Sequence, residues 1–97
     1  MTYSFHPEAE SEYLSQVAYY EEQRPGLGAL FVSQFETAMN YICSNPYSHK
    51  QIGEGIHLVS MKIFPFNILY RVAEETVQIL AMAHKRRRPG YWLSRLS

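Results

Sequence analysis

The sequence contains one cysteine and no long apolar run. Cys43 is the only cysteine among 97 residues, so no disulfide can form within the chain, and its place late in a predicted helix favours a buried thiol. No apolar stretch approaches the roughly 18 residues of a membrane span, and Met1–Pro7 lacks the cationic and apolar parts of a signal peptide. We therefore expect a cytoplasmic protein without a membrane partner.

The motifs of the common enzyme classes are also missing. The chain has no glycine-rich phosphate loop, no nucleophile motif of the G-x-S-x-G type and no cysteine–histidine cluster with metal spacing. His6, His49 and His57 lie far apart in the sequence and do not form a recognisable zinc set. The sequence therefore predicts no cofactor and no metal.

The length predicts a single domain covering residues 1–97, because soluble domains cluster near this size. The formal net charge is zero, but the charges are unevenly distributed. Residues 1–50 carry two basic and six acidic side chains, whereas residues 51–97 carry seven basic and three acidic ones. This asymmetry indicates an acidic or polyanionic partner at the basic C-terminal half.

Hydrophobic periodicity and chain breakers predict an α+β fold with element order β-α-α-β-β-β. The helical hairpin is the only cover available for the apolar face of an antiparallel sheet, so two layers are expected. A loop is predicted over Pro46–Gly55. The expected elements are a strand at Tyr3–His6, helices at Pro7–Gln23 and Leu27–Cys43, and strands at Ile56–Lys62, Phe66–Ala73 and Thr76–Ala83.

The most distinctive segment is the tail His84–Trp92, which places four consecutive cations beside two aromatic residues. Cations bind phosphates and aromatic rings stack on bases, so one interpretation is a nucleic-acid contact. The alternative is a solvated charge run that closes the fold, with Trp92 and Leu93 packing on the helices. Both interpretations stay open at this point.

Two further cations, Lys62 and Arg71, lie on the predicted strands. Strand alternation puts Arg71 on one face with Asn67 and Leu69, and the neighbouring apolar residues on the other face. The simpler interpretation of Arg71 is an ion pair with Glu74, Glu75 or an acidic partner.

Three segments together resemble the RelE/ParE family of toxins from type II toxin–antitoxin modules, a family that includes plasmid-stabilisation proteins. They are the strand-to-helix entry Phe5–Ala9, the strand Phe64–Val72 with its sequence FPFNILYRV, and Ile79–Trp92 with HKRRRPGYW. The resemblance covers nearly the whole chain and implies the same β-α-α-β-β-β order.

The resemblance implies a toxin that is held silent by a cognate antitoxin protein. RelE-like members cut messenger RNA on the ribosome without a metal, whereas ParE-like members bind and poison DNA gyrase and are not nucleases. A third alternative is a non-toxic, degenerate member that serves only as a binding partner of an antitoxin.

The resemblance carries site residues over only in part. Many nuclease members have an arginine where this chain has Asn67, and lysines where it has Leu58 and Ser60. The tail does match the nuclease members, because Arg87 falls where they have an arginine and Tyr91 lies near their tail tyrosine. The implied catalytic set is therefore Arg87 and Tyr91, helped by His84 and Arg86, with Lys62 in place of a strand cation, and the implied contact set is Lys85, Arg88, Arg71 and Trp92.

Overall fold

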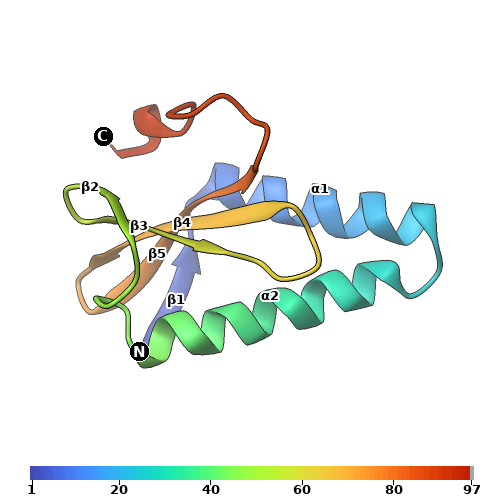
Figure 1. Cartoon of the computed structure of the whole chain (residues 1–97), viewed down its shortest axis with the longest axis horizontal. Helices are drawn as coiled ribbons and strands as arrows, with labels where there is room; N and C mark the ends of the chain where they lie inside the picture. The colour runs from blue at the N-terminus through green and yellow to red at the C-terminus, as the bar shows by residue number, and fades with distance from the viewer. Residues whose placement is uncertain (97) are drawn as a thin grey trace.

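The computed structural model describes residues 1–96 as two helices packed on a five-stranded sheet (Figure 1). The strand order in the sheet is β1-β5-β4-β3-β2. None of the helices in residues 1–96 is long and apolar enough to cross a membrane. The elements in chain order are β1 (Thr2–Phe5), α1 (Pro7–Gln23), α2 (Leu27–Ser44), β2 (Gln51–Gly53), β3 (Ile56–Ser60), β4 (Phe66–Ala73), β5 (Thr76–His84) and a 3-10 helix, η1 (Leu93–Leu96).

Local sequence explains where the helical hairpin begins and turns. His6 caps α1 by accepting a hydrogen bond from the Glu8 amide. Pro7 follows at the first helical position, where the fixed φ of proline matches the helix. At the turn, the Glu21 carboxylate accepts hydrogen bonds from the amides of Gly26 and Gly28. A Cβ at Gly28 would lie 2.8 Å from the Val17 carbonyl oxygen, so the hairpin needs a glycine there. The predicted antiparallel helix pair is confirmed.

The helices bury one face of the sheet in a core rich in aromatic rings. Phe31 and Phe35 on α2 are at most 1% exposed, and Phe31 contacts Tyr20, Phe64 and Phe66. Across the cluster the rings meet edge-on, tilted or stacked, at centroid distances between 4.5 and 6.5 Å. Such pairs add stability beyond their buried area. We call this cluster the helix-side core.

The sheet differs from the sequence prediction in two ways. The predicted loop Pro46–Gly55 contains the three-residue strand β2, which pairs with β3 and is too short and polar to show an alternating pattern. In addition, β1 pairs with β5 in parallel, so the sheet is mostly rather than wholly antiparallel. Cys43 is partly rather than fully buried, and this burial raises the pKa of its thiol.

An irregularity in β5 decides which side chains face which side. Leu69 of β4 pairs with Ala81, but the next residue, Tyr70, pairs with Ile79. The strand β5 therefore has one extra residue, Leu80, at this point. Such a bulge reverses the alternation of the residues that follow it. Met82 therefore joins the helix-side core, and Ala83 turns to the opposite face.

The opposite face of the sheet is covered too, which corrects the expectation that the helices provide the only cover. Figure 1 shows the C-terminal segment, in red, on the side of the sheet opposite α2. Trp92 is 7% exposed and packs with Leu69, Leu80 and Ala83 in a second core, which we call the tail-side core. Trp92 therefore packs on the sheet and not on the helices, and Leu93 is 57% exposed.

Candidate functional site

The cation run of the tail sits on a turn directly after β5. The Arg87 amide donates to the carbonyl of His84 at 2.9 Å, and the Lys85 amide donates to the carbonyl of Pro65 at 2.9 Å. These two backbone bonds fix the start of the turn to β5 and to the loop before β4. All four cationic side chains of the run, Lys85, Arg86, Arg87 and Arg88, are exposed.

A cavity of about 180 Å³ lies between this turn and the outer face of the sheet. Its floor is apolar and includes Leu58 and Leu69 from β3 and β4. Its rim is cationic and is formed by Lys85, Arg87 and Arg88. We call it the tail cavity, and it brings together the predicted site residues His84, Lys85, Arg87, Arg88, Tyr91 and Trp92.

Tyr91 links the cation run to the body of the protein. The guanidinium carbon of Arg87 lies 3.9 Å from the centre of the Tyr91 ring, which is a cation–π contact. On the other side, the Tyr91 hydroxyl donates to Glu12 Oε2 at 2.9 Å. Burial and this bond to a carboxylate raise the pKa of Tyr91 to about 12, so its phenol is protonated at neutral pH.

The buried Arg95 and the partly buried Glu12 form an ion pair that the sequence did not indicate. Arg95 is 8% exposed and donates from Nη1 to Glu12 Oε1 at 2.9 Å and from Nη2 to Glu12 Oε2 at 2.8 Å. Glu12 Oε1 also accepts the Met82 amide at 3.0 Å, and Arg95 Nη1 donates to the Leu80 carbonyl at 2.9 Å. We call Glu12, Tyr91 and Arg95 the latch, because they tie the C-terminal segment to α1 and β5.

The latch shifts the pKa values of both charged partners toward the ionised pair. Burial alone would raise the pKa of Glu12, but the hydrogen bonds from Arg95, the Met82 amide and Tyr91 outweigh it and lower that pKa. The hydrogen bond to Glu12 raises the pKa of Arg95 against the opposing effect of burial. The pair is therefore ionised at neutral pH.

His84 lies at the junction of two cavities. The bulge in β5 turns its ring toward the helix side, where it meets Phe66 edge-on at 5.2 Å and borders a second cavity of about 510 Å³ with Tyr19 and Tyr20. Its Nδ1 accepts the Arg86 amide at 3.0 Å. This bond makes Nδ1 the acceptor, so a neutral ring carries its proton on Nε2.

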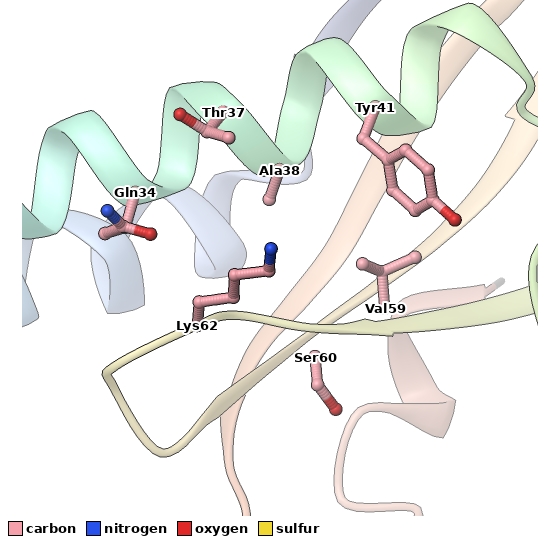
Figure 2. A pocket seen from close by; sticks show the side chains of 7 residues that line it. All are labelled: Gln34, Thr37, Ala38, Tyr41, Val59, Ser60 and Lys62. Carbon is pink, nitrogen blue, oxygen red and sulfur yellow. The ribbon is translucent and has the colours of Figure 1, made fainter.

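Lys62 is separated from the tail cavity. It lines a different cavity of about 360 Å³, between α2 and β3, together with Ala38 and Tyr41. Figure 2 shows the Lys62 side chain directed toward α2, while Ser60 points away from the helix. The structure therefore does not bring Lys62 to the cations of the tail.

Arg71 and Trp92 also differ from what the sequence suggested. Arg71 is partly buried and donates from Nε to Gln78 Oε1 at 2.7 Å and from Nη1 to the Leu96 carbonyl at 3.5 Å, so its partners are neither Glu74 nor Glu75. Trp92 is a buried part of the tail-side core, which makes it unsuited to stack on a base.

The three neutral residues at the positions of family cations face the outer side of the sheet. Leu58 and Asn67 line the tail cavity, and the Ser60 hydroxyl donates to Asn67 Oδ1 at 2.7 Å. None of the strand residues that line this cavity is a lysine or an arginine, and His84 at the end of β5 is the one histidine among them. Within residues 1–96, no group of three or more histidine, cysteine or acidic side chains is placed to hold a metal.

Comparison with known proteins shows which family the chain matches. The model of a family described as the ParE toxin of the type II toxin–antitoxin system parDE matches residues 3–89. Among solved structures, the chromosomal ParDE toxin–antitoxin system from P. aeruginosa is similar, with a TM-score of 0.71 over 87% of this chain and 95% of that chain at 16% identity. At that identity the likeness concerns the fold. None of the curated proteins matches the chain.

Proposed function

This chain belongs to the ParE toxin family of type II toxin–antitoxin systems, and we propose that it inhibits growth by binding DNA gyrase through its cationic tail, without cutting RNA. Membership of the family implies an antitoxin partner. The observation that carries the choice of target is the neutral sheet face of the tail cavity.

A metal-free ribonuclease has to stabilise the negative charge that builds up on the scissile phosphate. In the tail cavity, the strand positions that would supply this charge are Leu58 and Asn67, and Asn67 is already bonded to Ser60. Lys62 cannot replace them, because it lines the separate cavity between α2 and β3. All cations of the tail cavity come from the turn at its rim.

The same cavity offers no good general base at its aromatic end. A phenol with a pKa of about 12 is neutral at pH 7 and has its proton committed to Glu12. By contrast, four exposed cations on one turn form a surface that suits an acidic protein face or DNA held by a protein. The geometry thus supports a contact surface better than a catalytic one.

The direct test is the supercoiling of relaxed plasmid by purified gyrase with increasing amounts of the protein. We expect supercoiling to be blocked, and we expect Arg87→Ala to raise the inhibitory concentration about 10-fold, the equivalent of about 1.4 kcal/mol. Lys50→Ala removes an exposed cation outside the tail and is the matched control. Normal supercoiling at high concentrations of the wild-type protein would exclude the proposal.

Messenger-RNA cleavage is the second candidate, since His84 and Arg87 line one cavity. In that case Arg87, Tyr91, His84 and Arg86 would act on the RNA, and a translation mixture would accumulate cut messages that disappear with Arg87→Ala. Intact messages would exclude this candidate. A third outcome, no growth arrest when the protein is induced without its antitoxin, would indicate a non-toxic member that only binds an antitoxin.

A further inference from the structure

We propose that Glu12 is a positioning residue for the cationic tail, because it fixes Arg87 at the rim of the tail cavity through Tyr91 and Arg95. The inference rests on the proposed function, in which this rim contacts the target. It assigns a role to a helix residue that lies outside the cavity itself.

The first step is that Glu12 is fully used as an acceptor. Each of its two carboxylate oxygens receives two hydrogen bonds, all between 2.8 and 3.0 Å, from Arg95, Tyr91 and the Met82 amide. A carboxylate has about four lone-pair sites, so none is left for another group. A glutamine here would accept at only one atom and would lose the ion pair.

The second step is that Glu12 and Arg95 complete the sheet where β1 ends. β1 covers β5 only from Thr76 to Ile79, and the chain then turns into α1. Beyond that point, the Glu12 carboxylate accepts the Met82 amide and the Arg95 guanidinium donates to the Leu80 carbonyl. Two side chains thus bond to backbone groups that a longer strand would have paired, which anchors the latch to a rigid element.

The third step leads from the latch to Arg87. Gly90, at φ 80°, reverses the chain after the cation run, and a Cβ at this position would lie 3.1 Å from Leu93 Cδ1. The turn returns Tyr91 to Glu12, and the Tyr91 ring carries the Arg87 guanidinium at 3.9 Å. Within residues 1–96 no carboxylate forms an ion pair with Arg87. The Tyr91 ring is therefore the main support of this side chain.

The family model ends at residue 89, so Tyr91 and Arg95 lie beyond the matched range. The role of Glu12 in the latch is therefore argued from the contacts of this chain and not from the family match. It connects an acidic residue of the first helix with the last residues that the structure describes.

The test compares Glu12→Gln with Glu10→Gln, a control on the same helix whose side chain is exposed. Two measurements are made on each protein: hydrogen exchange of residues 91–96 by mass spectrometry, and the concentration that inhibits gyrase supercoiling. For Glu12→Gln we expect faster exchange in this segment and an inhibitory concentration raised about 10-fold, whereas Glu10→Gln should match the wild type.

A double variant separates positioning from general destabilisation. If Glu12 acts through Arg87, then Glu12→Gln combined with Arg87→Ala should inhibit no worse than Arg87→Ala alone, because residues that act in one chain of contacts are not additive. Full additivity of the two losses would overturn the proposal. So would a Glu12→Gln protein that exchanges and inhibits like the wild type.

Tyr91→Phe provides a milder variant if Glu12→Gln does not fold. It removes only the hydroxyl that bonds to Glu12 and leaves the ring under Arg87. Faster exchange of residues 91–96 in this variant supports the proposal, and unchanged exchange contradicts it. If the wild-type protein does not inhibit gyrase, the proposed target is wrong, but the exchange measurement still decides whether Glu12 holds the tail.

Discussion

The two faces of the sheet are stabilised in different ways. The helix-side core consists of many interlocking rings, such as Phe31 and Phe35, that are contributed by both helices and several strands. The tail-side core is smaller, and its cover is a short terminal segment held by the packing of Trp92, the Glu12–Arg95 ion pair and a few hydrogen bonds. From this difference we expect the first face to provide most of the stability of the fold, whereas the second carries the placement of the cations that we propose.

A largely buried ion pair suits this proposed second role. Removing two charges from water costs nearly as much as their attraction returns, so such a pair adds little net stability, yet leaving one partner alone is strongly unfavourable. We therefore expect the pair to favour the arrangement of the C-terminal segment in which both charges are paired. In that arrangement the Tyr91 hydroxyl bonds to Glu12 and the Tyr91 ring contacts Arg87.

The largest effect should come from the helix-side core. Phe31→Ala removes a side chain that is 0% exposed, and we expect the free energy of unfolding to fall by about 4 kcal/mol. Urea denaturation measures this loss, and Leu14→Ala, at a side chain that is 57% exposed, should change the value by less than about 0.5 kcal/mol. A loss for Phe31→Ala no larger than that of the control would contradict the comparison.

Arg95→Met should have an intermediate and local effect. It leaves the partly buried Glu12 carboxylate without its cation, and we expect the free energy of unfolding to fall by about 2 kcal/mol. This loss is below the usual range for buried pairs, because Glu12 keeps some contact with solvent. Hydrogen exchange should accelerate in residues 91–96 but not in α2. Equal acceleration in both segments would mean that the two faces unfold as one unit.

The contribution of the latch should depend on pH. The folded-state pKa of Glu12 lies below the ordinary value of 4.5, so its stabilising effect is complete above that value and is lost as the pH falls through the folded-state pKa. The difference in unfolding free energy between wild type and Glu12→Gln should be constant near pH 7 and shrink in acid. A difference that grows as the pH falls would refute the assignment.

The smallest effect concerns the loop between β3 and β4, which belongs to neither the tail nor the latch. Ile63 has φ 73° and is 70% exposed, and a β-branched residue is strained in that conformation. We expect Ile63→Gly to stabilise the protein by about 1 kcal/mol in urea denaturation, with unchanged exchange of residues 91–96. Destabilisation would contradict this expectation, because it would mean that the exposed Ile63 side chain stabilises the fold by more than its backbone strain costs.

The sequence predicted the elements with strong local signals and missed those that depend on distant partners. The boundaries of α1 and β4 agree with the prediction because prolines, caps and alternating patterns mark them. The bulge in β5 was missed, since the run from Ile79 to Ala83 is apolar throughout and shows no alternation. The strand β2 was missed because three residues cannot establish a period.

The candidate site was predicted only in its local part. The cation run could be recognised as a consecutive motif, and the structure places most of it around one cavity. Glu12 looked like an ordinary charge on an amphipathic helix, and its partner Arg95 lies 83 positions away. A weak signal was present, because Glu12 is three residues after the buried Ala9 and therefore lies near the apolar side of the helix.

The separation of Glu12 and Arg95 also has a consequence during synthesis of the protein. A contact between residues 83 positions apart can form only after the later one, Arg95, has left the ribosome. The aromatic core needs no residue beyond Met82, so most of the fold can assemble earlier. The contacts that hold the proposed inhibitory surface therefore form later than the aromatic core to which they attach it.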